Sequence, residues 1–106
     1  VIKQELQTLA LRLTQRRIAQ EASDGRTPGP ATSIMKIVST EIEKDHAELT
    51  TQLMGLQGQG WEGESFTEQE IAANRRFLSS RAASIYSGSN EIQANIIAKR
   101  VLGLPD

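Results

Sequence analysis

Apolar residues recur three or four positions apart along most of this chain, and that spacing is the period of a helix face. The first such stripe consists of Ile2, Leu6, Leu9 and Leu13. Comparable stripes recur in three later segments, and no useful length of chain alternates apolar and polar residues as a half-buried strand does. The predicted fold class is therefore all-α, an antiparallel four-helix bundle.

Glycine and proline mark the expected ends of the first two helices. The first apolar pattern fades at 23–25, and the prolines of 26–30 then exclude a helix, because proline lacks an amide donor. A second, longer helix is expected to begin near residue 30 or 31 and to end at Gly55. The glycine-rich stretch 56–65 has no periodicity, which predicts a flexible connector.

Capping signals mark the beginnings of the last two helices. Thr67 and the glutamate three residues later fit the capping-box pattern, so a third helix should start there and carry apolar residues as far as Ile85. The segment 86–89 interrupts it, and Ser89 can cap a fourth helix. That helix is expected to run to Gly103, with a proline shortly beyond it as the stop.

The second and fourth helices carry more apolar residues than one buried face requires. The residues outside a single stripe are Ile37 and Met54 in the second helix and Ile97 and Val101 in the fourth. Such a surplus is typical of surfaces buried against another domain or subunit, and it predicts self-association. Scattered surface apolar residues are the alternative interpretation, since these are common on folded proteins.

Composition argues against several classes of partner and site. The chain has 12 Lys and Arg against 13 Asp and Glu, and a net charge of −1 disfavours nucleic acid and anionic membrane as partners. It has no cysteine, which excludes thiolate metal sites and thiol nucleophiles and permits a reducing compartment such as the cytoplasm. No apolar run approaches the roughly 20 residues that span a bilayer.

The single histidine limits the chemistry further. Glu43 and His46 have the Glu-x-x-His spacing of di-metal bundles, but those bundles use the pair twice and this chain has one histidine. No metal site is therefore predicted. A serine nucleophile would depend on the same His46, and no strand–turn–helix elbow presents a serine.

The last third of the chain carries the pattern of a known family. Segment 77–105 reads FLSSRAASIYSGSNEIQANIIAKRVLGLP and strongly resembles, without a gap, the C-terminal signature of the acyl-CoA dehydrogenases. Upstream, Lys36 in its helix and the stretch 52–58, QLMGLQG, also look like this family. The resemblance covers 1–106, as the C-terminal helical domain of a longer protein, without the N-terminal helical and middle β-domains.

The resemblance implies an FAD-dependent enzyme that oxidises an acyl-CoA thioester to the trans-2-enoyl-CoA. In the family, a carboxylate removes the pro-R α-proton while the β-hydrogen leaves as hydride to flavin N5. The implied partners are an acyl-CoA substrate, an electron-transfer flavoprotein or similar acceptor, and further copies in a homodimer or tetramer. Packing of C-terminal domains at the centre of that assembly would account for the surplus apolar residues.

Candidate site residues follow from the same resemblance. One group matches the stretch that reaches the FAD of the neighbouring subunit: Gln52, Leu53, Met54, Gly55 and Leu56. A second group matches the turn and helix start that contact the FAD of their own subunit: Ser89, Asn90 and Glu91. Gly88 matches a position beside the thioester, where a side chain would obstruct the acyl chain.

The position of the catalytic base departs from one branch of the family. There a glutamate directly follows the tyrosine of this turn, whereas this chain has Ser87, whose hydroxyl does not accept a proton near neutral pH. Other branches place the glutamate on an earlier helix, ahead of Val1, so no catalytic residue is assigned within the chain. Two alternatives stay open: a non-catalytic helical subunit or scaffold domain, and a related flavoprotein oxidase or DNA-damage-response homologue.

Overall fold

The computed structural model describes residues 1–25 and 31–105, except for the side chains of 31–33, and it is helical throughout. The four α-helices are α1 (Ile2–Ser23), α2 (Ala31–Met54), α3 (Glu68–Ser80) and α4 (Asn90–Ile96). Three shorter segments join or extend them: the 3-10 helices η1 (Gly55–Gln59) and η2 (Arg81–Ser84) and the π-helical η3 (Ile97–Val101). No strand occurs in these two ranges, and the all-α prediction is confirmed.

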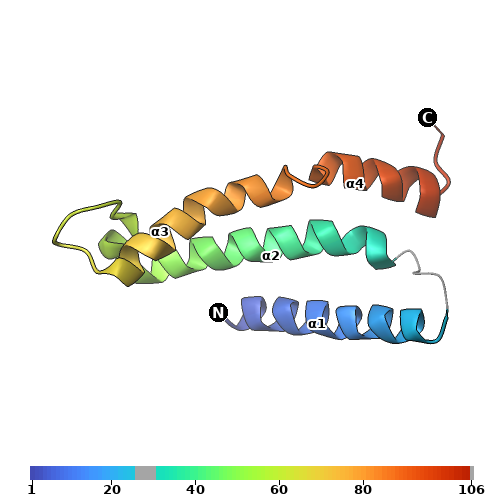
Figure 1. The fold of residues 1–106 in the computed structure, drawn as a ribbon, viewed down its shortest axis with the longest axis horizontal. Helices are drawn as coiled ribbons and strands as arrows, with labels where there is room; N and C mark the ends of the chain where they lie inside the picture. The colour runs from blue at the N-terminus through green and yellow to red at the C-terminus, as the bar shows by residue number, and fades with distance from the viewer. Residues whose placement is uncertain (26–30, 106) are drawn as a thin grey trace.

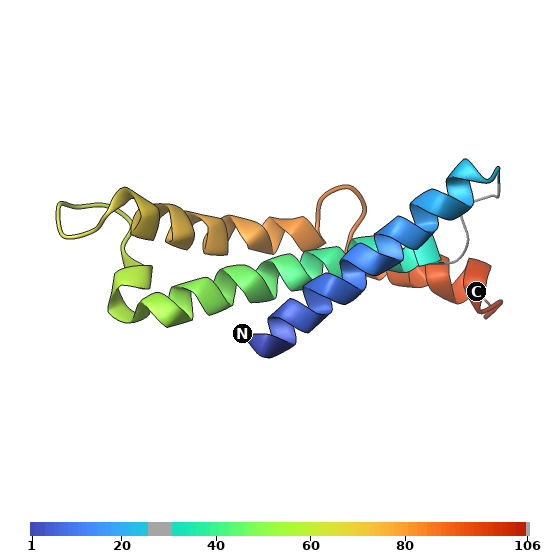
Figure 2. The same cartoon turned by 90° about the horizontal axis from the view of Figure 1, so that it is seen from below.

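The central element is α2, against which each of the other helices packs (Figure 1). α1 runs antiparallel along one side of it, and Figure 2 shows that the two helices cross obliquely. α3 and α4 follow one another along the other side, also antiparallel to α2 (Figure 1). The bundle is therefore elongated, with extents of 53 × 31 × 21 Å, and α2 spans most of its length.

The buried core is small for a chain of this length. The radius of gyration is 17.4 Å, whereas a compact domain of this length would have one of about 13 Å. The buried apolar residues among those described are Ala47, which lies between α2 and α3, and Ala83 of η2, and every larger apolar side chain is at least partly exposed. Substantial apolar surface therefore remains uncovered within the chain.

The surplus apolar residues predicted on α2 are accounted for by its central position. Ile37 lines the space between α2 and α1, and Met54 lies between α2 and α3. Both are half-buried, because α2 has neighbours on two sides. The larger uncovered face belongs to α1, whose Ile2 and Leu6 are 78% and 62% exposed.

The capping signals in the sequence are confirmed. Thr67 accepts a hydrogen bond from the Glu70 amide at 3.3 Å, and its own amide donates to Glu70 Oε2 at 2.7 Å, which completes the capping box. The Ser89 hydroxyl accepts from the Ile92 amide at 3.4 Å. Ser23 ends α1 as expected, and the predicted break at 26–30 lies outside the described residues.

The third helix ends earlier than predicted. α3 stops at Ser80, the chain continues as η2, and Ile85 lies beyond both with 69% of its surface exposed. Serine hydroxyls donate to backbone carbonyls three residues back at this point, Ser80 to Phe77 at 2.7 Å and Ser84 to Arg81 at 3.2 Å. Such bonds compete with the α-helical ladder, which explains the change to 3-10 geometry.

The prediction of a flexible connector after α2 is wrong over its first part. Gly55, at φ 60°, terminates α2 as expected, but the chain then forms η1 and folds back. Gly58 packs so closely on α2 that a Cβ there would lie 3.0 Å from Thr51 Cα. The absence of a side chain at Gly58 is what lets η1 and α2 meet.

The second part of this connection is held by α3. Asn74 Nδ2 donates to the Gly60 carbonyl oxygen at 2.9 Å. The Arg75 guanidinium lies 5.1 Å from the centroid of the Trp61 ring, a cation–π distance. Side chains of α3 thus position the 60–61 backbone, and the sequence pattern gave no sign of these contacts.

Candidate functional site

The two groups of candidate cofactor residues lie at different places along α2. Gln52–Leu56 forms its C-terminal end and the start of η1, whereas the start of α4 lies against Lys36 and Thr40. At the helical rise of about 1.5 Å per residue, roughly 20 Å of α2 separates Thr40 from Met54. The structure therefore does not bring the two groups together within one chain.

The first group borders an open groove between η1 and α3. Gln52, Gly55 and Leu56 line this groove, which has a volume of about 470 Å³. Leu53 and Leu56 are 70% and 83% exposed, so they present apolar surface at the end of the bundle. Met54 turns the other way and packs between α2 and α3. Four of the five predicted residues are thus accessible from outside, and Met54 is mainly structural.

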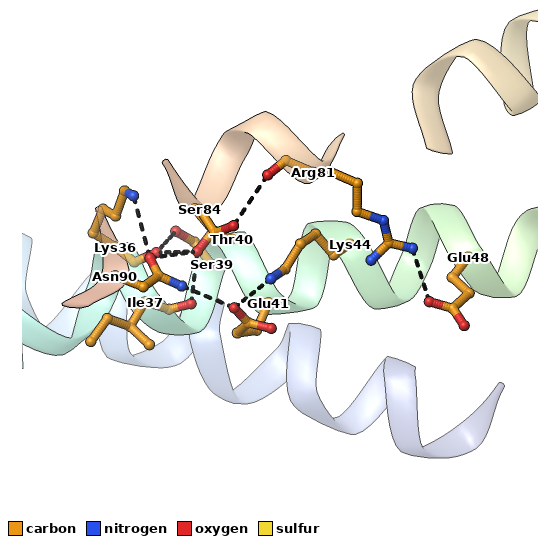
Figure 3. A network of polar contacts seen from close by, with 10 residues as sticks. All are labelled: Lys36, Ile37, Ser39, Thr40, Glu41, Lys44, Glu48, Arg81, Ser84 and Asn90. Atoms are coloured by element: carbon orange, nitrogen blue, oxygen red, sulfur yellow. Dashed lines mark hydrogen bonds and ion pairs between the residues drawn. The ribbon is translucent and has the colours of Figure 1, made fainter. Parts of the chain in front are cut away.

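Gln52 is also connected to the ion pair that fastens η2 to α2. Its amide donates to Glu48 Oε1 at 3.4 Å, and Glu48 Oε2 pairs with Arg81 at 3.0 Å (Figure 3). Arg81 in turn lies over the Phe77 ring, 4.5 Å from its centroid. The pair is exposed to solvent, and such pairs contribute about 0–1 kcal/mol. The Glu48–Arg81 pair therefore contributes little to the stability of the fold, and its main effect is to hold Glu48 where it bonds Gln52.

Asn90 joins α4 to α2 through hydrogen bonds that the sequence did not indicate. Its side chain lies on α2 (Figure 3), where Oδ1 accepts from Lys36 Nζ and from the Thr40 hydroxyl, each at 3.3 Å. Its Nδ2 donates to Glu41 Oε1 at 2.9 Å, and Glu41 also pairs with Lys44 at 2.7 Å. Both polar atoms of the amide are used, so Asn90 fastens α4 to α2.

The turn before α4 has an unusual backbone. Ser87 has φ 56° and Gly88 has φ 87°, so two successive residues adopt left-handed conformations. Ser87 is the one non-glycine residue with positive φ among those described, and its side chain is exposed. A Cβ at Gly88 would lie 3.0 Å from Gln93 Nε2. The turn thus presents bare backbone at Gly88, directly before the first turn of α4.

Glu91 lies in the first turn of α4. Among the described residues, it is the one whose pKa clearly departs from its usual value. Hydrogen bonds to its carboxylate, first from its own backbone amide and then from the Ser89 hydroxyl, lower its pKa. Desolvation opposes this and raises the pKa, and the positive charges of Lys36 and Lys44 lower it by smaller amounts. The side chain is fully exposed, so the carboxylate is accessible to solvent.

We expect Glu91→Gln to flatten the acid dependence of stability. Because the folded pKa is depressed, the stabilisation by the carboxylate is complete above its unfolded pKa, about 4.3, and is lost as pH falls through the folded pKa. Urea unfolding midpoints at pH 7 and pH 3 should therefore differ less for the variant than for the wild type. Glu62→Gln, an exposed carboxylate in the connection before α3, is the matched control. Equal pH dependence for both variants would contradict the assignment.

Two kinds of site are absent from the described part of the chain. No group of three or more His, Cys, Asp or Glu residues lies close enough together to hold a metal ion in residues 1–25 and 31–105. None of the helices in these ranges is long and apolar enough to cross a membrane.

Comparison with known proteins decides the family. The family model described as the C-terminal domain of acyl-CoA dehydrogenase matches residues 1–102. The chain belongs to the acyl-CoA dehydrogenase family. This confirms the resemblance of segment 77–105, and the family domain is a helical bundle, as observed.

Among curated acyl-CoA dehydrogenases, the chain is similar to three mycobacterial proteins. It is 39% identical to acyl-CoA dehydrogenase IpdE1 of Mycolicibacterium smegmatis over 90 residues, 85% of this chain and 22% of that protein. It is 40% identical to IpdE1 of Mycobacterium tuberculosis over 73 residues, 69% of this chain and 18% of that protein. It is 29% identical to acyl-CoA dehydrogenase FadE34 of M. tuberculosis over 93 residues, 88% of this chain and 12% of that protein. No solved structure matches. The chain spans less than a quarter of the length of these relatives.

Proposed function

We propose that the intact protein carrying this domain is an FAD-dependent dehydrogenase that oxidises an acyl-CoA thioester to the 2-enoyl-CoA. The observation that carries the proposal is the 87–88 turn, whose two left-handed residues leave bare backbone beside the start of α4. In the family pattern, this is where the thioester and the flavin meet. The intact protein then works in the cytoplasm with an electron-transfer flavoprotein or similar acceptor.

The residues at both candidate places suit a flavin cofactor. When bound, FAD accepts the hydride from the β-carbon. At the start of α4, backbone amides of the turn offer hydrogen bonds, and Gly88 has no side chain to block the thioester. At the end of α2, Gln52 offers an amide, and Leu53 and Leu56 offer apolar surface. Cofactor sites are typically lined by apolar surface with a small number of polar groups, and the two places together offer both.

The separation of the two places supports a homo-oligomer. Two residue groups separated by about 20 Å along α2 do not line one pocket within a single copy, and the family resemblance has the 52–56 stretch reach the flavin of a neighbouring copy. We therefore assign Ser89, Asn90 and Glu91 to the flavin of their own subunit and 52–56 to the flavin of a neighbour. Asn90 contributes by fastening α4 to α2, since its side chain is already fully bonded.

The intact protein should be purified and its flavin content measured by absorbance. We expect one FAD per subunit. Acyl-CoA should reduce this flavin under anaerobic conditions, and an artificial electron acceptor should reoxidise it. The second candidate is a non-catalytic scaffold domain of an acyl-CoA dehydrogenase-like complex, since Ser87 stands where one branch of the family has its catalytic glutamate. A folded intact protein that neither retains flavin nor reacts with any acyl-CoA would reject the dehydrogenase and leave the scaffold.

Ser87→Ala is expected to leave turnover of the intact enzyme within about tenfold of wild type, since a positioned general base contributes about 10²–10⁴ in rate. A serine without a partnered base does not remove a proton from the α-carbon near neutral pH. Steady-state oxidation of acyl-CoA with flavin content verified is the measurement. A loss of three orders of magnitude with FAD still bound would make Ser87 catalytic.

A further inference from the structure

We propose that Arg81 is a positioning residue for the groove between η1 and α3, because it holds two of the side chains that line this groove, Gln52 and Phe77. This role rests on the proposed function, in which the 52–56 stretch contacts a flavin. Arg81 begins η2 and is distant from Gln52 in the sequence, yet it determines how tightly the groove holds the cofactor.

The first contact of Arg81 is with the wall of the groove. Its guanidinium lies 4.5 Å from the centroid of the Phe77 ring, and Phe77 lines the groove together with Gln52. The two residues are four positions apart, a spacing at which side chains of successive helical turns meet. A cation over the face of an aromatic ring is attracted by the quadrupole of the ring. Arg81 therefore restricts the orientation of the Phe77 ring.

The second contact reaches the groove through Glu48. Arg81 Nη2 lies 3.0 Å from Glu48 Oε2, which joins η2 to α2 (Figure 3). The other carboxylate oxygen, Oε1, accepts a hydrogen bond from Gln52 Nε2 at 3.4 Å. Each oxygen of Glu48 is thus occupied by a different donor. The ion pair with Arg81 keeps the carboxylate in the place from which it bonds Gln52.

This arrangement sets which end of the Gln52 amide is available in the groove. An ionised carboxylate only accepts hydrogen bonds, so Glu48 binds the NH2 end of the amide. The carbonyl oxygen of Gln52 is then left for a donor, and a flavin cofactor carries hydroxyl and N–H groups of this kind. Without Glu48 in place, the amide is free to turn and present either end. Arg81 thereby fixes the hydrogen-bonding character of the groove at Gln52.

The exposure of the ion pair separates this role from a structural one. The side chains of Arg81 and Glu48 are 45% and 47% exposed. Exposed pairs contribute little to stability, because water screens the charges and both side chains lose freedom. Removal of Arg81 should therefore weaken cofactor binding while the urea midpoint of the flavin-free protein hardly changes. A residue with a merely structural role would lower the urea midpoint.

Fluorescence titration of FAD against the flavin-free intact protein is the test. Arg81→Met removes the cation and keeps a long side chain, and it should raise the dissociation constant about tenfold, since Gln52 and Phe77 are both released. Gln52→Ala should raise it about fivefold, the value of one hydrogen bond. If Arg81 acts through Gln52, the double variant should bind FAD within about twofold of Arg81→Met. Independent residues would instead give a loss of about fiftyfold.

Two further variants complete the test. Arg81→Lys keeps a cation near Glu48 and Phe77 and should bind FAD within about threefold of wild type. Arg76→Met removes an exposed arginine of α3 and controls for the loss of charge, so its affinity should stay within about twofold.

The positioning role is overturned if Arg81→Met binds FAD as tightly as Arg76→Met, if the double variant shows the fiftyfold loss, or if Arg81→Met lowers the urea midpoint in proportion to the affinity. Each of these results leaves the proposed flavin site intact. A wild-type protein that binds no FAD rejects the proposed function and the positioning role together, so the two failures are distinguished by the wild type alone.

Discussion

Gly58→Ala is expected to destabilise the protein by about 1–3 kcal/mol, the range for forcing an extra methyl group into a closely packed contact. The added Cβ would lie 3.0 Å from Thr51 Cα and 3.1 Å from Thr51 C, and it would be still closer to the Thr51 carbonyl oxygen. All three atoms are backbone in the middle of a helical turn, so no side-chain rotation relieves the contact. The remaining response is for η1 to move away from α2.

That movement has a second consequence at the candidate site. The groove lined by Gln52 and Leu56 is formed by η1 and α3, so displacement of η1 opens it. Reduced flavin content of the intact protein should therefore accompany the lower urea midpoint. Gln57→Ala, at an exposed residue of the same segment, should change the free energy of unfolding by less than about 0.5 kcal/mol. A Gly58→Ala variant as stable as this control would show that η1 does not pack on α2 as described.

Asn90→Leu should cost about 1–2 kcal/mol, because it removes the side-chain hydrogen bonds that join α4 to α2. Lys36, Thr40 and Glu41 all lose their contact with α4, and Thr40 is only 7% exposed. The start of α4 would then be held by its cap alone, and we expect flavin content to fall with it. Asn95→Leu, an exposed asparagine of the same helix, is the control, and equal effects of the two would reject the role of Asn90.

A paired exchange separates the hydrogen bonds from simple loss of volume. Asn90→Asp keeps the acceptor for Lys36 and Thr40 but puts a carboxylate where Nδ2 lay 2.9 Å from Glu41 Oε1. Like charges at this distance are repulsive, so Asn90→Asp alone should destabilise α4 docking at neutral pH. Adding Glu41→Gln restores a donor on the other side and should recover most of the loss. Without that recovery in urea unfolding, the Asn90–Glu41 bond would not be the contact that matters.

The features that the sequence predicts correctly depend on neighbouring residues. The capping box of Thr67, the Ser89 cap and the glycine that ends α2 act within a few residues, so their signals are complete in the local sequence. The sequence likewise located the interruption at 86–89, although the left-handed backbone of Ser87 and Gly88 was found only in the structure. These positions define the ends of the helices and one half of the candidate site.

What the sequence could not predict depends on contacts between distant segments. The bonds of Asn90 join residues about 50 positions apart, and Gly58 is required only because η1 returns to α2. Periodicity identified the apolar stripe of Ile2, Leu6, Leu9 and Leu13 on α1, but a stripe does not state what covers it, and α2 meets another side of α1, which includes Gln4, Gln7 and Leu11. The early end of α3 arose from serine hydroxyls, whose competition with the helical ladder has no periodic signal.

The central position of α2 has a consequence for how the molecule opens. α1 packs on α2 and scarcely meets α3 or α4, and the buried apolar residues, Ala47 and Ala83, both lie on the side of α2 away from α1. Detaching α1 therefore disrupts few of the contacts that hold the rest. Proteins open in cooperative units whose free energies follow the contacts broken. We therefore expect α1 to form one such unit, which opens while α2, α3 and α4 stay folded.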